Sequence, residues 1–265
     1  MDRKDLICFR TWFSDYCRTF YSRNAEDQRN IVLKEQHTHN VCKNIVRLSE
    51  EESLTADEIL LAETTALFHD IGRFEQYAQY KTFSDSISVN HATLGEKIVS
   101  DKGVLRILPE REQGLILQAI RFHNAYRIPD ARDHESLLLL RLIRDADKLD
   151  IWRVFLEYYE APAGERASAV GLDLPDTPEY SEEILACIFE RRIALLSSLK
   201  TLTDFKLLQI SWIYDINFEA SLRMLEERNY LNRIIKTVPQ TEEIVQVAVA
   251  VQDYLQTRLK AYRSS

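Results

Sequence analysis

The chain has 265 residues, of which 45% are hydrophobic and 29% are charged. These fractions allow a sizeable folded core and exclude a chain that is disordered by composition. Six glycines and six prolines amount to about 2% each, against averages of about 7% and 5%, which disfavours turn-rich β-sandwiches, β-barrels and glycine-rich nucleotide loops. The formal charge is −8 and no run of Lys or Arg occurs, so we expect no long nucleic acid as a partner.

Apolar residues recur at helical spacing along almost the whole sequence, and no segment makes a credible strand. Up to residue 149 the spacing predicts helices over about 5–22, 28–49, 55–72, 91–100, 109–123 and 135–149. Thr55 and Glu58 have the spacing of a capping box, and Asn90 is a further candidate cap. Gly72 is expected to end the third helix, and Pro109 suits the first turn of the fifth. The sequence therefore predicts an all-α fold.

The segment 161–177 interrupts the helical pattern, because it holds two of the six glycines and three of the six prolines lie between Pro162 and Pro178. We expect a loop here. A further helix is expected before it, from about residue 152, and helices over about 180–199, 204–228 and 241–262 should follow it. The expected parts of the chain are an N-terminal helix that packs on the core (1–27), a central helical domain (28–160) and a C-terminal helical extension (161–265).

Several features of the sequence bear on where in the cell the protein is located. Charged side chains lie within the first five residues and no small-residue cleavage site follows, so no secretory signal is expected. Apolar runs such as 247–251 are too short to cross a bilayer. Cys8, Cys17, Cys42 and Cys187 lack CxxC pairing and are predicted to be buried thiols in a reducing compartment. We therefore expect a cytoplasmic protein with no membrane partner.

Five short stretches contain residue types that bind metals, each at or near the end of a predicted helix: QHTHNV, LFHDIG, VNHATLG, IRFHN and DADKLD. The candidate ligands are His37, His69, Asp70, His91, His123 and Asp147. Mixed imidazole and carboxylate groups suit a transition metal that promotes hydrolysis. Taken singly, each histidine is more often an ordinary core or surface residue, so the specificity lies in the ordered set.

Six ligands are more than one ion would use while keeping a position open for substrate. Two ions that share the Asp70 carboxylate would account for all six. His69 and Asp70 are adjacent, so on a helix they project at about 100° to each other and can hold one ion together. His37 and His39 face roughly opposite ways on a helix, and His37 shares its face with Val41. We therefore expect His37 to be the ligand and His39 to be exposed.

The order His, His-Asp, His, His, Asp, with the local strings HTHNV, LFHDIG and ADKLD, resembles the HD superfamily of metal-dependent phosphohydrolases. The resemblance covers about residues 30–160, roughly half of the chain. It implies an HD-domain helical bundle with additional C-terminal helices, in which helix ends converge on one or two divalent transition-metal ions (Fe, Mn, Ni, Co or Zn). It also implies that His37, His69, Asp70 and Asp147 hold the first ion, and that His91 and His123 hold the second, with Asp70 bridging.

This arrangement would make Asp70 catalytic as well as a ligand. A carboxylate between two cations loses most of its proton affinity and can serve both. Water that bridges two divalent ions is acidified towards neutrality, which supplies hydroxide for in-line attack on phosphorus. The implied substrate is a small phosphorylated molecule, for which a nucleotide is one option.

Two cationic residues beside the motifs are the other predicted catalytic residues. Arg73 follows HDIG and could clamp a non-bridging phosphate oxygen, and the family often has Lys at this position. Lys148, next to Asp147, could do the same. Asp145 and Asp150 are expected either to support the ligands or to be solvated.

Aromatic residues follow the HD motif in the string RFEQYAQYKTF. Tyr77, Tyr80 and Phe83 could form a wall for a base or sugar, or they could serve ordinary packing. His134, in ARDHES, is expected to be a loop or helix-cap residue.

Several branches of the superfamily have signatures that this sequence lacks. The ppGpp hydrolase type has Glu-Asp shortly after the HD pair, and the cyclic-di-GMP phosphodiesterase type has a GYP signature. The remaining resemblance is to compact two-metal phosphohydrolases, including those that cleave dinucleoside polyphosphates. It implies an enzyme that cleaves a phosphate ester or anhydride of a nucleotide or of another small phosphorylated metabolite.

Two alternatives remain open. A minority of HD proteins are di-iron oxygenases with the same six-ligand set, and spacing alone does not separate them. The chain could also be a regulatory module that binds metal or nucleotide without turnover. The C-terminal helices could close over the site, complete the bundle or form the face of a homodimer.

Overall fold

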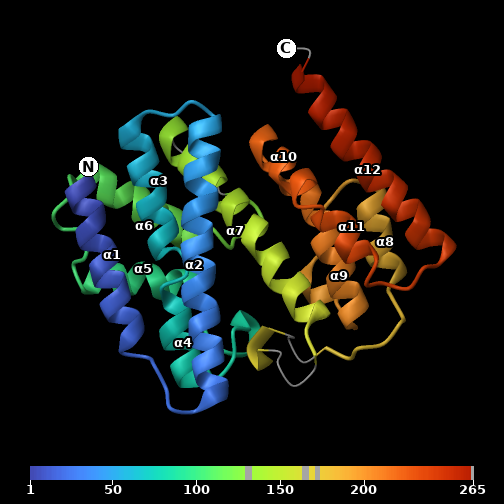
Figure 1. Cartoon of the computed structure of the whole chain (residues 1–265), viewed down its shortest axis with the longest axis horizontal. Helices are drawn as coiled ribbons and strands as arrows, with labels where there is room; N and C mark the ends of the chain where they lie inside the picture. Colours follow the sequence, from blue (N-terminus) through green and yellow to red (C-terminus); the bar gives the residue numbers. More distant parts are fainter. Residues whose placement is uncertain (129–132, 163–166, 171–173, 264–265) are drawn as a thin grey trace. The chain divides into compact units, whose positions relative to one another are not determined.

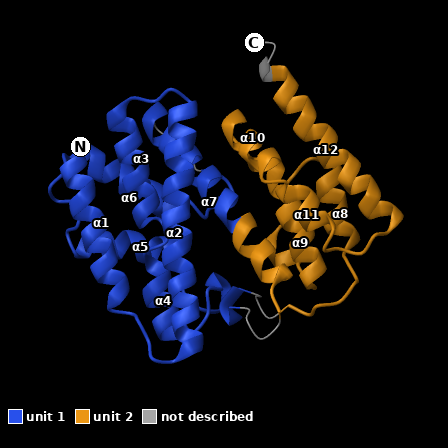
Figure 2. Cartoon of the chain, viewed as in Figure 1, with its two compact units in different colours: residues 1–151, 165–170 blue, residues 152–164, 171–265 orange. Residues whose placement is uncertain are grey.

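The structure of the protein is a computed structural model that describes residues 1–128, 133–162, 167–170 and 174–263. Every secondary-structure element in these ranges is helical (Figure 1), so the predicted all-α fold is confirmed. The chain divides into two compact units (Figure 2): the first holds Met1–Ile151 and Glu165–Val170, and the second holds Trp152–Gly164 and Gly171–Ser265. The division after Ile151 falls inside one long helix, α7 (His134–Glu160).

The first unit carries all of the candidate metal ligands. Its helices are α1 (Arg3–Arg18), α2 (Ala25–Glu51), α3 (Ala56–Phe68), α4 (Gly72–Tyr80), the 3-10 helix η1 (Asp85–Ile87), α5 (His91–Asp101), α6 (Glu110–Phe122), the first part of α7, and the 3-10 helix η3 (Ser168–Val170). Helix α3 packs against α1, α2 and α6, and α5 packs against α4 and α6. Helix α3 therefore lies at the centre of the unit, and its C-terminal end lies at the HD motif.

Local signals in the sequence set where these helices begin. Thr55 and Glu58 form the predicted capping box at the start of α3, in which each side chain bonds the other residue's backbone amide. Asn90 caps α5 by accepting a hydrogen bond from the Thr93 amide at 3.0 Å. Pro109 precedes the first turn of α6 as its N-cap rather than lying inside that turn, and its carbonyl accepts the Gln113 amide.

The prediction that one helix runs to Gly72 is wrong. Helix α3 ends at Phe68, and His69 and Asp70 lie in a turn. Gly72 then begins a separate helix, α4, which the sequence did not predict. The two helices expected on either side of residue 150 are instead the single helix α7. The turn between α3 and α4 puts His69 and Asp70 at a helix junction.

Aromatic and aliphatic side chains fill the interior of the first unit. Phe9, Phe13, Phe68 and Phe74 are fully or almost fully buried, and the Phe9 and Phe68 rings meet edge to face at 5.8 Å.

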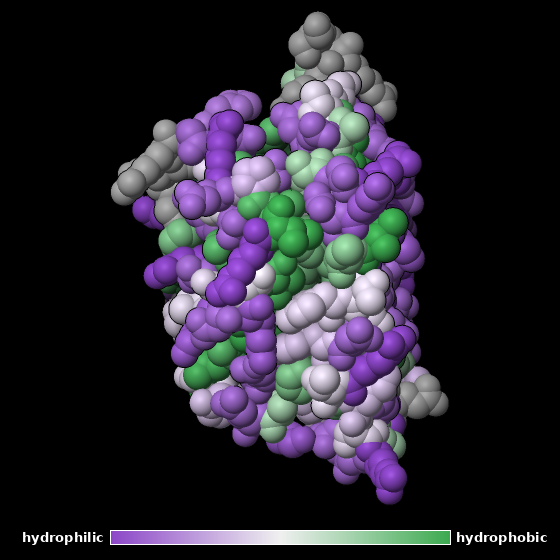
Figure 3. Space-filling model, turned by 90° about the vertical axis from the view of Figure 1, so that its left-hand side faces the viewer, coloured by the Kyte–Doolittle hydropathy of each residue, from purple (hydrophilic) through white to green (hydrophobic). Residues whose placement is uncertain are grey.

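Figure 3 shows a face of the molecule that is mostly hydrophilic and carries a smaller hydrophobic area near its middle. Three of the four cysteines are buried, but Cys8 is exposed, because it lies on the outer side of α1, so its predicted burial is wrong.

The second unit follows the middle of α7. It contains the end of α7, then α8 (Glu182–Phe189), η4 (Leu196–Ser198), α9 (Leu202–Ser211), η5 (Trp212–Asp215), α10 (Glu219–Glu227), α11 (Tyr230–Ile235) and α12 (Glu242–Arg263). The helices expected over 180–199 and 204–228 are thus each shorter or divided. Part of the loop expected at 161–177, namely 163–166 and 171–173, lies outside the described residues. In the described part of the chain no helix is both long and apolar enough to cross a membrane.

Candidate metal centre

Five elements of the first unit bring the six candidate ligands together. His69 and Asp70 lie in the turn after α3, His91 is the first residue of α5, His123 directly follows α6, His37 lies on α2, and Asp147 lies on α7. Three overlapping triads each have ligand atoms within 4.8 Å of one another: His37, His69 and Asp70; His69, His123 and Asp147; and Asp70, His91 and His123. Except for the half-buried Asp147, all six residues are buried.

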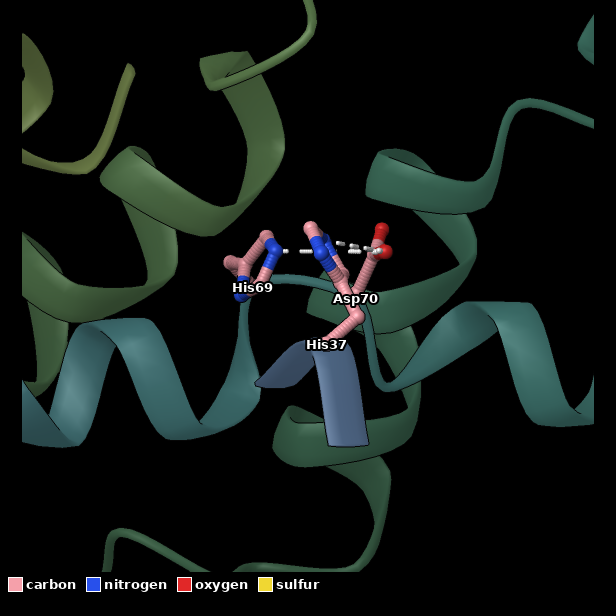
Figure 4. A group of neighbouring side chains, drawn as sticks. All are labelled: His37, His69 and Asp70. Carbon is pink, nitrogen blue, oxygen red and sulfur yellow. Dashed lines mark ion pairs between the residues drawn. The ribbon is translucent and has the colours of Figure 1, made fainter. Parts of the chain in front are cut away.

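One half of the centre gathers around the Oδ2 atom of Asp70. The Nε2 atoms of His37 and His69 lie 3.5 and 3.9 Å from this oxygen. The same two nitrogens lie 3.1 and 3.6 Å from Asp147 Oδ1. Figure 4 shows the two imidazoles, from α2 and from the end of α3, directed towards the Asp70 carboxylate. We call His37, His69, Asp70 and Asp147 the first half of the centre.

The other half gathers around the second oxygen of the same carboxylate. His91 Nε2 lies 3.2 Å from Asp70 Oδ1, and His123 Nε2 lies 3.8 Å from it. The two imidazole nitrogens are 3.1 Å apart. We call Asp70, His91 and His123 the second half of the centre. Asp70 therefore presents one oxygen to each half.

The shortest separations between ligand atoms, 3.1 and 3.2 Å, match the size of a metal site, and the others, up to 3.9 Å, are slightly wider. An ion with ligand bonds of about 2.1 Å holds neighbouring ligand atoms about 3.0–3.4 Å apart in octahedral or tetrahedral geometry. His37 Nε2, His69 Nε2 and Asp147 Oδ1 are buried and make no well-formed hydrogen bond within the described residues. Burying a polar atom without a partner costs about 1–3 kcal/mol, so an additional binding partner at this point is expected. The residues present therefore fit a metal ion.

Each imidazole is fixed through its other nitrogen. The Nδ1 atoms bond Asp150 Oδ2 (His37, 2.7 Å), the Ala66 carbonyl (His69, 2.7 Å), Asp85 Oδ2 (His91, 2.7 Å) and the Ile120 carbonyl (His123, 2.7 Å). An Nδ1–H donated in this way leaves the Nε2 lone pair for a metal. In each half, one histidine is thus held by a carboxylate and the other by a backbone carbonyl.

The two histidines held by carbonyls follow from how their helices end. His69 and His123 are the C-cap residues of α3 and α6. The last carbonyls of a helix have no partner within the helix, and each imidazole bonds the carbonyl three residues before it. The same local hydrogen bond, from Nδ1 to the carbonyl three residues earlier, therefore positions one histidine in each half.

Helix α7 is anchored to its neighbours by buried polar contacts near Asp147. Asn44 on α2 donates a hydrogen bond from Nδ2 to the Ala146 carbonyl at 3.0 Å. Arg144 on α7 donates from Nη1 to the carbonyl of His123 at 3.2 Å. These contacts fix Asp147 relative to α2 and the end of α6.

A glycine pair lets the second half form. Gly72, the last residue of HDIG, is so close to α5 that a Cβ would lie 2.2 Å from the His91 carbonyl oxygen and 2.8 Å from the Gly95 amide nitrogen. A Cβ on Gly95 would lie 3.3 Å from the Gly72 nitrogen. The starts of α4 and α5 therefore meet backbone to backbone, which brings His91 next to Asp70.

Two cations lie beside the shared carboxylate, and one of them, Lys34, was not predicted from the sequence. Lys34 Nζ is 2.8 Å from Asp70 Oδ2, and Arg73 Nε is 3.5 Å from Asp70 Oδ1. Burial acts to raise the pKa of Asp70, but the charge of Lys34, followed by those of His69 and Arg73, holds it well below its usual value. Lys34 precedes His37 by three residues and so shares its helix face, which is the signal that would have found it.

Arg73 is more constrained than the sequence predicts. Its Nη1 donates to Gln76 Oε1 at 2.8 Å, to the Phe83 carbonyl at 2.5 Å and to Asp85 Oδ1 at 2.9 Å. One end of the guanidinium therefore holds the connection between α4 and α5, while Nε faces Asp70. Asp85 was not singled out in the sequence. Because it lies in a polar stretch outside the predicted helices, no local pattern marks it.

The remaining predicted residues are placed as follows. Lys148 is half-buried on α7, next in sequence to Asp147. His39 is exposed while His37 is buried, as their spacing predicts. His134 is the exposed first residue of α7.

The proposed aromatic wall does not form as one surface. Tyr77 is buried, donates a hydrogen bond to Asp27 Oδ1 at 3.1 Å and packs on Phe83 with ring centroids 5.2 Å apart, whereas Tyr80 is exposed. Phe83 is the aromatic residue nearest the cations: Lys34 Nζ lies 5.1 Å from its centroid. Packing therefore explains Tyr77, and Phe83 is the ring that borders the centre.

His37 and His123, one from each half, differ in their proton affinity in the metal-free protein. Burial and Lys34 act to lower the pKa of His37, but the carboxylates of Asp147 and Asp150 raise it to about 9. Burial, followed by the neighbouring imidazoles of His91 and His69, lowers the pKa of His123 to about 3. His123 is thus neutral and ready to bind a metal, whereas His37 must first lose a proton.

Comparison with known families identifies the domain that carries these ligands. The HD domain family matches residues 35–152, a range that contains all six candidate ligands. These residues form an HD domain. HD domains belong to a metal-dependent, hydrolase-type superfamily and bind divalent metals, in agreement with the His and Asp cluster. No curated protein and no solved structure matches the chain significantly. The matched HD range ends at residue 152, just after the division between the two units.

Proposed function

We propose that this protein is a metal-dependent phosphohydrolase with a two-ion centre. Its substrate would be a small phosphorylated molecule, such as a nucleotide, in which a phosphate ester or anhydride is cleaved. His37, His69, Asp70 and Asp147 would hold the first ion, and Asp70, His91 and His123 the second. We also assign it to the cytoplasm, with no long nucleic acid and no membrane as partner.

The observation that carries this proposal is the orientation of Asp70. Its two oxygens face two different sets of imidazoles, with Oδ2 3.5 Å from His37 Nε2 and Oδ1 3.2 Å from His91 Nε2. A carboxylate that serves a single ion would not need ligand nitrogens on both oxygens. Two-ion sites suit displacement at phosphorus, because the two ions supply an acidified water and neutralise the charge of the phosphoryl group.

The chain's own residues would prepare the site for that chemistry. Asp150 and Asp85 accept the Nδ1–H of His37 and His91, which keeps both imidazoles in the metal-binding tautomer. Since the pKa of Asp70 is held well below its usual value, the shared ligand is ionised at neutral pH. None of the ligands in the second half has to lose a proton there, because the pKa of His123 is lowered to about 3 and that of His91 is also lowered.

Positive side chains beside the centre favour an anionic substrate. The side chains of Lys34 and Arg73 are each 14% exposed and approach opposite oxygens of Asp70. An ammonium and a guanidinium in this position suit the non-bridging oxygens of a phosphate group. In this proposal Lys34 joins Arg73 and Lys148 as a substrate-binding cation.

An activity screen tests the proposal against its two rivals. Protein loaded separately with Mn²⁺, Fe²⁺, Co²⁺, Ni²⁺ and Zn²⁺ is incubated with nucleoside mono-, di- and triphosphates, dinucleoside polyphosphates and sugar phosphates. Release of phosphate or of a phosphorylated product that is absent in Asp70→Ala supports hydrolysis. Oxygen uptake by the iron form with a polyol or phosphonate would instead support the di-iron oxygenase. Nucleotide binding by calorimetry, with no product by chromatography, would support the regulatory module.

A further inference from the structure

Asp85 lies outside the six candidate ligands but contacts several residues around the second half of the centre. It begins η1, in the connection between α4 and α5, and its side chain is 28% exposed. Four side chains hydrogen-bond to its carboxylate: His91, Arg73, Gln76 and Asn124. His91 is itself a candidate ligand, and Asn124 directly follows His123.

The contact with His91 uses both carboxylate oxygens. His91 Nδ1 lies 2.7 Å from Asp85 Oδ2 and 2.9 Å from Oδ1. The same carboxylate accepts hydrogen bonds from Arg73 Nη1 and Gln76 Nε2, so it is also the acceptor for the Nδ1–H of His91. The imidazole is thereby held with Nε2 directed at Asp70 Oδ1, 3.2 Å away.

The contact with Arg73 keeps a cation in place. The guanidinium lies between two carboxylates: Nη1 donates to Asp85 Oδ1 at 2.9 Å, and Nε lies 3.5 Å from Asp70 Oδ1. That Nε is buried and has no hydrogen-bond partner within the described residues. Without Asp85, the guanidinium would lose one of its two carboxylates and would gain by moving onto Asp70 Oδ1, the oxygen that belongs to the second half.

We propose that Asp85 is a positioning residue for the second half of the metal centre, which orients His91 and keeps the Arg73 guanidinium from closing the present 3.5 Å to Asp70 Oδ1 into a hydrogen bond. Loss of Asp85 therefore weakens the second ion in two ways: it frees the His91 ring, and it lets a fixed positive charge compete for a ligand atom. The first half is unaffected, because His37 has its own carboxylate in Asp150. This inference rests on the two-ion centre proposed above, but not on which reaction that centre performs.

Manganese binding by the full-length chain tests this role without an activity assay. Metal-free wild type and Asp85→Ala are titrated with Mn²⁺ by calorimetry, and bound Mn²⁺ is counted by elemental mass spectrometry after gel filtration. We expect two ions per chain in wild type and one in Asp85→Ala, with at least a tenfold weaker second binding step, since loss of such an outer contact costs about 10–100-fold in metal affinity. The electron paramagnetic resonance spectrum should change from that of a coupled pair to the six lines of an isolated Mn²⁺.

Matched variants separate this role from a general loss of structure. Asp101→Ala removes an exposed aspartate at the other end of α5 and should bind two ions as wild type does. Asp85→Asn keeps the shape and an acceptor oxygen but not the charge, and its second step should be intermediate. In Asp85→Ala/Arg73→Ala the competing cation is gone, so the second ion should bind more tightly than in Asp85→Ala alone.

The outcomes are distinct. If Asp85→Ala binds two ions with wild-type affinity, or if it loses both ions equally, the positioning role is wrong. If the double variant binds the second ion no better than Asp85→Ala, the role of holding Arg73 is wrong. If wild type itself binds fewer than two ions, the proposed two-ion centre is wrong. The positioning role of Asp85 is then wrong as well.

Discussion

Gly72 and His91 touch through their backbones: a Cβ on Gly72 would lie 2.2 Å from the His91 carbonyl oxygen. The two residues begin neighbouring helices, α4 and α5. Because the nearest atoms belong to the backbone, no rotamer change could relieve the overlap. The glycine of HDIG is therefore needed where it stands, and its contact places a ligand of the second half beside the shared aspartate.

Gly72→Ala is expected to push the start of α5 away from α4. Overpacking of this kind typically costs about 1–3 kcal/mol in the free energy of unfolding. The displacement carries His91 with it, so the second ion should also bind more weakly. Urea unfolding and Mn²⁺ titration of the same variant measure the two effects.

Gly114 offers the matched control, since it also lies in a helix but a Cβ there would meet nothing within 4 Å. Gly114→Ala should stabilise the protein by about 0.5–1 kcal/mol, because alanine is the better residue inside a helix. Equal destabilisation of both variants would contradict the role assigned to the Gly72 contact.

Lys34→Ala is expected to lower kcat/KM for a phosphorylated substrate while the number of bound ions stays at two. A hydrogen bond between charged groups contributes about 1.5–3 kcal/mol, so the expected loss is about 10- to 150-fold. Steady-state kinetics and elemental mass spectrometry on the same sample separate substrate binding from metal binding. Lys97→Ala, on the exposed side of α5, should leave both unchanged. If Lys34→Ala loses an ion, and kcat/KM falls only because of that loss, the assignment of Lys34 to substrate binding is wrong.

The stability of the metal-free protein should depend on pH through His37. Its pKa in the folded chain is about 9, above the value of about 6.5 for an unfolded histidine. The protonated imidazole therefore contributes stability that is fully present below about pH 6.5 and is lost as the pH rises through about 9. As the pH rises from about 6.5 to about 9, the free energy of unfolding measured with urea should fall further for chelator-treated wild type than for His37→Gln. Parallel curves for the two proteins would show that His37 does not titrate in this way.

His39→Ala tests which histidine of HTH faces the centre. The His39 side chain is exposed, and exposed substitutions usually change stability by less than about 0.5 kcal/mol, so activity should stay within about twofold. His37→Ala, in contrast, should lose the first ion. Activity and metal content of the two variants check this, and a larger loss in His39→Ala would mean that the inward face of α2 is wrongly assigned.

Much of the fold could be predicted because its signals are local. The capping box of Thr55 and Glu58 and the cap at Asn90 depend on residues three positions apart, and both form as predicted. The inward position of His37 follows from helical geometry alone. The ordered set of histidines and aspartates likewise identified the residues that the fold brings together.

The missing parts depend on contacts between distant segments. Gly72 was expected to stop a helix, because a glycine after a hydrophobic run usually does, whereas here it is the first residue of α4 and lies against the backbone of α5. Asp85 has no motif of its own, and its importance appears only when His91 lies next to it. Lys34 shares the helix face of His37 and could have been found from that spacing. In the second unit, the helical spacing continues through η5, although residues 216–218 after it are not helical, so periodicity alone did not divide α9 from α10.

The number of metal ions per chain tests the central claim most directly. Protein purified without chelator or affinity nickel, and then its Asp70→Ala variant, is analysed by elemental mass spectrometry after reconstitution with Mn²⁺. We expect about two ions per chain in wild type and at most one in Asp70→Ala, which should also be inactive, because both oxygens of Asp70 face ligand nitrogens. A wild type that holds one ion or fewer after reconstitution, or an Asp70→Ala variant that holds two, would contradict a centre in which this carboxylate is shared.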